Sequence, residues 1–197
     1  MPSYTLTYFN IKGRGEPIRW LLSYLKKDFE DKRIAPQDWP KHKDSILFGK
    51  VPVLDVDGKR LYQSDAICRY LAKEGNLAGD NSLESQEIDA IVGSFNDLLG
   101  AVSPLWKITD PKEKEELKDK LKSTVIPSYF KIYDDVAKSG YLANGKLSWA
   151  DFFIIAGQGT LEFVIGADLI SGYPNLVALR TKITNLPGVK EWIEKHP

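Results

Sequence analysis

The sequence contains very little cysteine and histidine, and it has no excess of charge of either sign. Its single cysteine, Cys68, excludes an intramolecular disulfide and a thiol pair for redox exchange. The two histidines, His42 and His196, lie far apart in the chain and do not suggest a metal cluster. Lysine plus arginine and aspartate plus glutamate both total 27, so no net field attracts phosphate backbone or anionic lipid. We therefore expect neither a nucleic-acid nor a membrane partner.

Long apolar runs are also missing. The most continuous apolar stretch, Phe152 to Leu161, is much too short to span a bilayer. The first residues, Met1 to Thr5, lack the basic segment and following apolar run of a secretory signal. Both observations favour a cytoplasmic location. With 197 residues and 43% apolar content, the chain is long enough for two small domains or one large one.

Residues 1–75 have the pattern of a small α/β domain. Tyr4–Tyr8 alternates as a strand does, and Phe29–Ile34 predicts a second strand. Between them, Pro17 begins a helix whose apolar residues have helical spacing. Further strands are predicted at Val53–Val56 and Arg60–Tyr62. The predicted order is strand, helix, strand, hairpin and helix.

The turns of this domain have their own signals. Asp57-Gly58 favours a tight hairpin turn between the last two strands. Ser64 is predicted to cap the following helix, and Gly75 is predicted to end it in the left-handed conformation. Cys68, inside that helix, is expected to be a small buried residue. The polar segment 76–82 is interpreted as a domain linker.

Residues 83–197 predict an all-helical second domain. Its first helix has an apolar stripe formed by Ile88, Ile91, Val92, Phe95, Leu98, Leu99 and Val102. Pro127 is expected to bend the next long helix. Ser148 and Asp151 fit a capping-box variant before a helix that is apolar nearly all round. We expect that helix at the domain centre, with the segments 174–186 and 187–195 packed outside it.

Several motifs, taken together and in order, resemble the cytosolic glutathione transferases of the sigma class, including invertebrate sigma enzymes and haematopoietic-type prostaglandin D synthases. They are Thr7-Tyr8-Phe9-Asn10, Gly13-Arg14-Gly15-Glu16, Asp38-Trp39-Pro40, Phe48 to Leu54, Gln63-Ser64 and Trp149-Ala150-Asp151-Phe152. The resemblance covers almost the whole chain. It implies a thioredoxin-like first domain, an all-helical second domain, glutathione as cosubstrate and a homodimer.

The resemblance also implies roles for individual residues. Tyr8, with Arg14 nearby, would stabilise the glutathione thiolate. The glutathione-binding set would be Tyr8, Arg14, Trp39, Lys43, Gly49, Lys50, Val51, Pro52, Gln63, Ser64 and, from the partner subunit, Asp97. The pocket for the electrophile would be formed near Phe9, Gly13, Trp106 and Phe152. Val51-Pro52 would be a cis-proline turn whose Val51 backbone pairs with the cysteinyl backbone of glutathione.

Each of these residues also has a structural interpretation. Tyr8 is compatible with a packing residue of a strand, and Ser64 with a plain helix cap. Lys43 and Asp97 are compatible with ordinary surface charges. The vertebrate prostaglandin synthase has further aspartates for a magnesium or calcium site where this chain has Gly93 and Asn96, so we expect no metal.

Three functions stay open at this level. The first is conjugation of glutathione to small apolar electrophiles, namely lipid-peroxidation carbonyls and aryl halides, with hydroperoxide reduction as a side activity. The second is glutathione-dependent prostaglandin D isomerisation. The third is a non-catalytic role as a lens crystallin or ligand carrier, and the presence of both Tyr8 and Arg14 argues against it.

Overall fold

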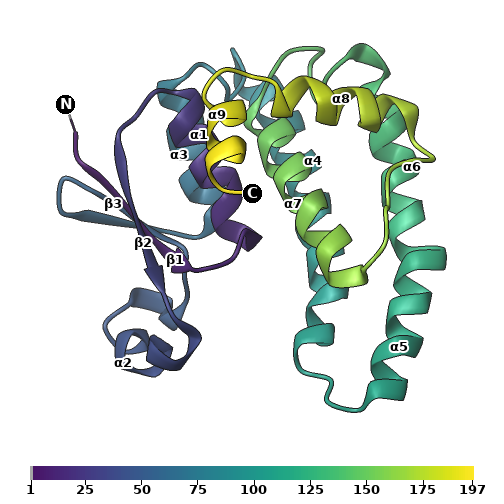
Figure 1. The fold of residues 1–197 in the computed structure, drawn as a ribbon. Helices are drawn as coiled ribbons and strands as arrows, with labels where there is room; N and C mark the ends of the chain where they lie inside the picture. Colours follow the sequence, from purple (N-terminus) through teal and green to yellow (C-terminus); the bar gives the residue numbers. More distant parts are fainter. Residues whose placement is uncertain (1) are drawn as a thin grey trace.

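A mixed four-stranded sheet forms the first part of the molecule in this computed structural model, which describes residues 2–197 (Figure 1). The strands are β1 (Tyr4–Phe9), β2 (Phe29–Ile34), β3 (Val53–Val56) and β4 (Lys59–Tyr62), in the order β2-β1-β3-β4. β1 is parallel to β2 and antiparallel to β3. This agrees with the predicted thioredoxin-like arrangement.

The alternation in β1 determines which of its side chains enter the core. The odd-numbered residues of this strand are half-buried, whereas the even-numbered residues, Tyr4, Leu6 and Tyr8, are buried. The predicted hairpin is present, because Asp57 and Gly58 both have positive φ, at 51° and 85°. A two-residue turn of this kind matches the twist of the strands that it joins.

Helices α1 (Glu16–Tyr24) and α3 (Ser64–Glu74) pack against each other and complete this α/β part. A short helix, α2 (Trp39–Lys43), lies below the sheet in Figure 1, between the one-turn segments η2 (Pro36–Asp38) and η3 (Leu47–Gly49). Another one-turn segment, η1 (Gly13–Gly15), leads from β1 into α1.

Two predictions about the ends of α3 are wrong. The residue that precedes the helix is Gln63, with φ 67°, and Ser64 is already its first helical residue. At the other end, Asn76 has the positive φ of 55°, whereas Gly75 has φ −107°. A Cβ atom at position 75 would overlap the end of the Leu25 side chain, so a larger residue there would require that side chain to move.

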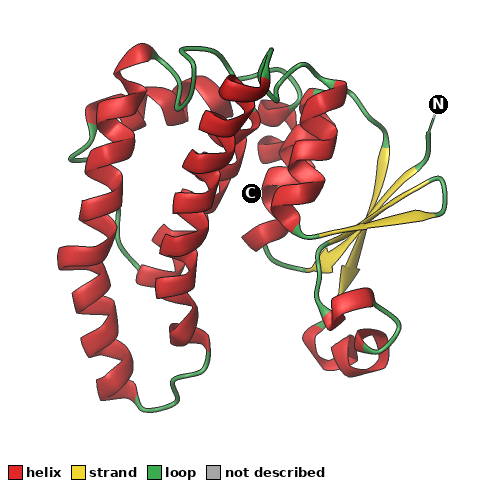
Figure 2. Cartoon of the chain, turned by 180° about the vertical axis from the view of Figure 1, so that it is seen from behind, coloured by secondary structure: helices red, strands yellow, loops and turns green. Residues whose placement is uncertain are grey.

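The second part of the molecule is entirely helical, and Figure 2 shows the strands confined to the other half. Its helices are α4 (Ser82–Val102), α5 (Pro111–Lys120), α6 (Ile126–Val136), α7 (Trp149–Ile165), α8 (Pro174–Thr184) and α9 (Val189–Lys195). The one-turn segments η4 (Ser103–Trp106) and η6 (Ala137–Ser139) follow α4 and α6. The irregularity expected from Pro127 is a π-helical turn, η5 (Leu121–Val125), directly before α6.

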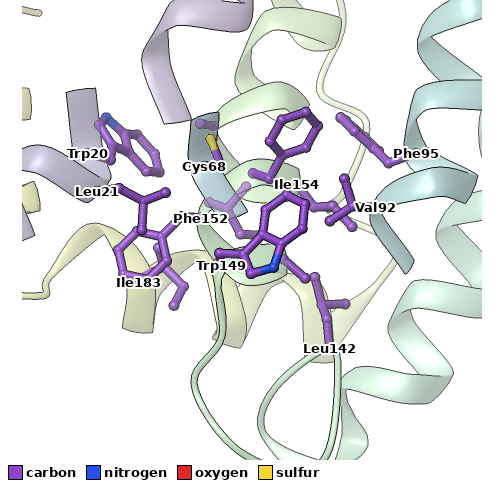
Figure 3. Packing of buried hydrophobic residues seen from close by; sticks show 14 of the residues in the cluster. Trp20, Leu21, Cys68, Val92, Phe95, Leu142, Trp149, Phe152, Ile154 and Ile183 are labelled. Carbon is purple, nitrogen blue, oxygen red and sulfur yellow. The ribbon is translucent and has the colours of Figure 1, made fainter. Parts of the chain in front are cut away.

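The buried core runs through both parts and is centred on α7 (Figure 3). Trp149, Phe152 and Ile154 of this helix are almost completely buried, and α7 packs against α1, α3, α4 and α8. The capping box is confirmed, because the Asp151 carboxylate accepts from the Ser148 backbone N–H at 2.8 Å. It also accepts from the Leu142 backbone N–H at 2.9 Å, which ties the preceding loop to the helix.

The last helix does not lie where the sequence placed it. α9 packs against α1 of the first part, and the ring of Trp192 lies 5.3 Å from that of Phe29 on β2. The Trp192 indole N–H donates to the Glu16 carboxylate at 3.0 Å. The segment 187–195 therefore covers the α/β part, while α8 covers α7 as expected.

Within residues 2–197, no helix is both long enough and apolar enough to cross a membrane. The same residues contain no group of three or more histidine, cysteine, aspartate or glutamate side chains arranged to hold a metal ion. The domain boundaries at 75 and 83 stay predictions, although they agree with the end of α3 at Glu74 and the start of α4 at Ser82.

Candidate active site

Tyr8 lies near the end of β1, with only 6% of its surface exposed. Its hydroxyl oxygen accepts a hydrogen bond from the backbone N–H of Arg14 at 3.1 Å. Two glycines permit this contact, because a Cβ at Gly13 would lie 2.7 Å from the Tyr8 hydroxyl oxygen and one at Gly15 would lie 2.9 Å from its Cγ. The loop after β1 therefore closes directly over the phenol ring.

The surroundings of Tyr8 make its hydroxyl a hydrogen-bond donor. Burial raises the pKa of the Tyr8 hydroxyl, and the Arg14 N–H together with the charges of Arg14 and Arg19 partly offsets this rise. The phenol therefore keeps its proton at neutral pH. Because the Arg14 N–H already occupies a lone pair of the oxygen, the hydroxyl hydrogen is available to a ligand acceptor.

The Arg14 side chain connects the two parts of the molecule. Its guanidinium donates to the Asn96 amide oxygen on α4 at 2.9 Å and to the Ser64 hydroxyl at the start of α3 at 3.4 Å. One residue thus supplies a backbone N–H to Tyr8 and a positive charge to the space between α3 and α4.

A cavity of about 320 Å³ opens beside Arg14. It is lined by Arg14, Phe48, Lys50, Val51, Pro52, Tyr62, Gln63, Ser64, Asp65 and Asn96. The Val51-Pro52 peptide bond is cis, as predicted. The N-terminus of α3 borders the same cavity, and free backbone N–H groups at a helix N-terminus attract carboxylates. A peptide-like anion of modest size fits this chemistry.

The structure brings most of the predicted glutathione-binding residues to this region. Arg14, Lys50, Val51, Pro52, Gln63 and Ser64 line the cavity, and Tyr8 joins them through its bond to Arg14. Trp39 lies next to this group, because its ring packs edge-on against Phe9 at 5.3 Å, and Phe9 packs against Tyr8 at 5.6 Å.

Lys43, Gly49 and Asp97 lie outside the residues that line the cavity. A Cβ at Gly49 would lie 3.5 Å from the Lys43 side chain, so those two residues are neighbours. Asp97 is exposed on α4, one position after Asn96. Its expected contact with a partner subunit stays a prediction.

The predicted electrophile pocket is brought together only in part. Phe9 and Gly13 lie beside Tyr8, and Trp106 is 65% exposed on η4. Phe152 does not line a pocket, because it is completely buried and its ring packs 5.2 Å from that of Tyr24 on α1. The apolar face of α7 that carries Phe152 is used for packing the two parts together.

Four cavity residues were not predicted from the sequence as binding residues, namely Phe48, Tyr62, Asp65 and Asn96. Asp65 follows Ser64 directly in the motif at the start of α3, which was a usable signal. Asn96 had no such signal as a partner of Arg14, since the two residues lie 82 positions apart.

Fold and site together define a two-part protein whose thioredoxin-like half carries a polar binding cavity against an all-helical half. Residues 4–73 match the family model described as "Glutathione S-transferase, N-terminal domain". Residues 96–196 match the family model described as "Glutathione S-transferase, C-terminal domain". The chain belongs to the glutathione S-transferase family.

Some of the similar proteins are named prostaglandin D synthases, and others are named glutathione S-transferases. The chain is 38% identical to the hematopoietic prostaglandin D synthase of Homo sapiens, over 100% of this chain and 98% of that protein. It is 36% identical to glutathione S-transferase S1 of Drosophila melanogaster, over 99% of this chain and 79% of that protein. A solved structure of a Nilaparvata lugens prostaglandin synthase D superposes with a TM-score of 0.95 and 45% identity, over 99% and 98% of the two chains.

Proposed function

We propose that this protein is a sigma-class glutathione transferase that ionises the thiol of glutathione beside Tyr8 and joins the sulfur to small apolar electrophiles. The substrates we expect are lipid-peroxidation carbonyls and aryl halides, with hydroperoxide reduction as a side activity. The observation that carries the proposal is the Tyr8 hydroxyl, which accepts from the Arg14 N–H at 3.1 Å and retains its own hydrogen for a sulfur acceptor.

The hydroxyl would act by stabilising the charged form of the thiol. A hydrogen bond to a charged group is worth about 1.5–3 kcal/mol, which corresponds to about one to two pKa units. From a thiol pKa of about 8.5, a two-unit decrease raises the thiolate fraction at pH 7 roughly 25-fold. A more stable thiolate is less nucleophilic, by roughly eightfold for a Brønsted slope near 0.45. The net gain from ionisation is therefore only about threefold.

Most of the acceleration must then come from holding the electrophile beside the sulfur, where effective molarities are very large. We propose that Phe9, Gly13 and Trp106 contribute to the pocket that does this. Phe9 and Gly13 adjoin Tyr8, which supports their part in the proposal.

Glutathione would lie along the cavity next to Arg14. In this proposal its γ-glutamyl carboxylate lies at the N-terminus of α3, near Gln63 and Ser64, because helix N-termini favour anions. The Val51 backbone would pair with the cysteinyl unit, as a peptide pairs with the edge of a sheet. The glycyl end would lie toward Trp39, Lys43, Gly49 and Lys50.

We further propose a cytoplasmic homodimer in which the partner subunit's Asp97 binds the γ-glutamyl ammonium group. Exposure of Asp97 on α4, close to the cavity residue Asn96, supports this assignment. The neutral Gly93 and Asn96 support an interface without a resident metal ion, because hard divalent cations prefer carboxylate ligands.

Isomerisation of a prostaglandin endoperoxide is the second candidate function. The relatives named prostaglandin D synthase, at 38% and 45% identity, favour it as much as the transferase relatives favour conjugation. Pocket shape determines which electrophile aligns with the sulfur, so product analysis separates the two functions.

The test is a competition assay that offers alkenals, aryl halides, hydroperoxides and the endoperoxide with glutathione, and compares kcat/KM for each. We expect thioether products from alkenals and aryl halides at the highest kcat/KM. A higher kcat/KM for the endoperoxide, with glutathione released unchanged, would replace the proposal by the isomerase function. Binding of glutathione without turnover of any substrate would instead indicate a non-catalytic carrier.

A further inference from the structure

Arg19 is an arginine with no exposed surface, in the first turns of α1 and close to Tyr8. Arginine is almost never fully buried unless its charge is paired. Its role therefore has to be found in the contacts of its guanidinium group.

Three of the five hydrogen bonds from the guanidinium go to backbone carbonyls at the end of β1 and in the loop that follows it. One terminal nitrogen, Nη1, donates to the carbonyl oxygens of Ile11 at 2.8 Å and Lys12 at 3.4 Å. The other, Nη2, donates to the carbonyl oxygen of Phe9 at 3.4 Å. These carbonyls belong to the segment between Tyr8 and Arg14, so the arginine fixes that segment from below the surface.

Two carboxylates compensate the buried charge. Glu16 lies 3.1 Å from Nη1, and Asp31 of β2 lies 3.1 Å from Nε. Asp31 also forms an ion pair with the more exposed Arg33, at 2.7 Å. Glu16 accepts in addition from the indole N–H groups of Trp20 and Trp192, both at 3.0 Å. The guanidinium is therefore paired directly with carboxylates of α1 and β2, and Glu16 connects it indirectly to α9.

The same guanidinium lies against Tyr8. Its central carbon is 5.8 Å from the centre of the Tyr8 ring. Gly15 fits between the two groups, because a Cβ there would lie 2.9 Å from Tyr8 Cγ and 3.3 Å from Arg19 Nη1. A shift of the loop relative to Arg19 would therefore also displace the Arg14 N–H from the Tyr8 hydroxyl.

We infer that Arg19 is a positioning residue, which holds the loop 9–12 so that the Arg14 N–H and the Tyr8 hydroxyl stay aligned for a bound thiolate. The inference rests on the proposed function, since it assigns a second layer of residues to the same site. Arg19 makes no contact with the cavity itself, so it acts through Tyr8.

The test compares Arg19→Lys with the unchanged protein by titrating the thiol of bound glutathione through its thiolate absorbance. Lysine keeps the positive charge but loses the planar fork, so the substitution isolates the geometry of the loop. We expect the thiol pKa to rise by about half to one unit, compared with about one to two units for Tyr8→Phe. The dissociation constant of glutathione should change less than about threefold, since the cavity contacts are kept.

A double-mutant cycle separates positioning from general loosening of the fold. If Arg19 acts through Tyr8, Arg19→Lys produces no further rise of the thiol pKa in the Tyr8→Phe background. An equal rise in both backgrounds, or no rise in either, would overturn the inference. Arg180→Lys is the control, because Arg180 pairs with Glu162 of α7 and makes no hydrogen bond to residues 9–14, and it should leave the thiol pKa unchanged.

A second variant keeps the test available if Arg19→Lys does not fold. Arg19→Met combined with Glu16→Gln removes the buried ion pair and leaves the net charge unchanged, while Asp31 keeps its ion pair with Arg33 at 2.7 Å. The same rise, dependent on Tyr8, is expected. If the unchanged protein shows no lowered thiol pKa with glutathione, the proposed function itself fails, and the positioning role fails with it. A lowered pKa that Arg19 variants do not alter contradicts the positioning role alone.

Discussion

Gly15 is the residue on which Tyr8 and its loop depend most sharply. It has no Cβ, and an added methyl group would lie 2.5 Å from Cδ1 of the Tyr8 ring. Its backbone is in the right-handed helical region, with φ −80°, so a substitution acts by steric overlap alone. Position 15 therefore permits a direct test of how closely the ring must be held.

For Gly15→Ala we expect kcat to fall at least tenfold and the free energy of unfolding to fall by about 1–3 kcal/mol, because the ring or the loop must move. Conjugation assays and urea denaturation measure these two quantities. Gly100→Ala on α4 is the control, since no atom lies within 4 Å of its added methyl group, and it should preserve activity. An unchanged kcat in Gly15→Ala would show that the loop does not position Tyr8.

Some residues of the site could be predicted from the sequence, and others could not, for physical reasons. Tyr8, Val51 and Ser64 belong to short motifs that the resemblance to glutathione transferases assigned to the site. The bonds from Arg14 to Asn96 and from Arg19 to the loop carbonyls depend on tertiary placement. A lone arginine in a sequence is most often a solvated surface residue, and nothing local marks Arg19 as an exception, whereas Arg14 belongs to the motif Gly13-Arg14-Gly15-Glu16.

Helix α7 shows the same limit for a whole element. Its capping box was predictable because the box is local in sequence, and the structure contains it. The side that faces a pocket was not predictable, because a helix that is apolar nearly all round has no distinct polar face. Phe152 consequently was assigned to the electrophile pocket, although it packs against Tyr24 in the core.

The capping carboxylate of α7 makes a prediction about pH. Burial raises the pKa of Asp151 to about 6, and its hydrogen bonds to Leu142 and Ser148 offset this only in part. In the unfolded chain the pKa is the ordinary value of about 3.9, so between about pH 4 and 6 the folded state binds more protons. Asp151 therefore contributes less stability as the pH rises through this window.

We expect the unfolding free energy of the unchanged protein, relative to Asp151→Asn, to increase by on the order of 2–3 kcal/mol when the pH is lowered from 7 to 4. Urea denaturation of both proteins at several pH values measures this difference. The comparison with Asp151→Asn removes the contributions of all other titrating groups. A difference that is constant, or that decreases toward pH 4, would contradict the assigned pKa.

At the scale of the whole molecule, the two parts of the chain meet at the site. Arg14 reaches from the loop after β1 to Asn96 on α4, and Trp192 on α9 returns to Glu16 on α1. The succession of strands and helices along the chain and the division into an α/β and a helical part followed from the sequence. The packing of α9 against the first part could not be predicted, because the sequence of a short helix does not indicate which element it packs against.

The proposed shared site predicts a dependence on assembly. Asp97→Ala should weaken glutathione binding about tenfold in the dimer, because a charge-assisted bond to the γ-glutamyl ammonium is lost. Calorimetric titration of glutathione over a range of protein concentrations, with sedimentation to define the oligomeric state, measures this. Asp110→Ala, at the N-cap of α5, is the control, because it removes a different carboxylate from the helical part of the chain. Equal weakening in monomer and dimer would rule out a contribution across subunits.

The most direct test of the account is a pH titration of the thiolate absorbance of bound glutathione in the unchanged protein and in Tyr8→Phe. Phenylalanine fills the same space under Gly13 and Gly15 but has no hydroxyl, so the hydrogen bond to the sulfur is removed together with the one that the hydroxyl accepts from the Arg14 N–H. We predict that the thiol pKa rises by about one to two units in Tyr8→Phe while the affinity for glutathione changes little. Coincident titration curves for the two proteins would contradict the central role of Tyr8.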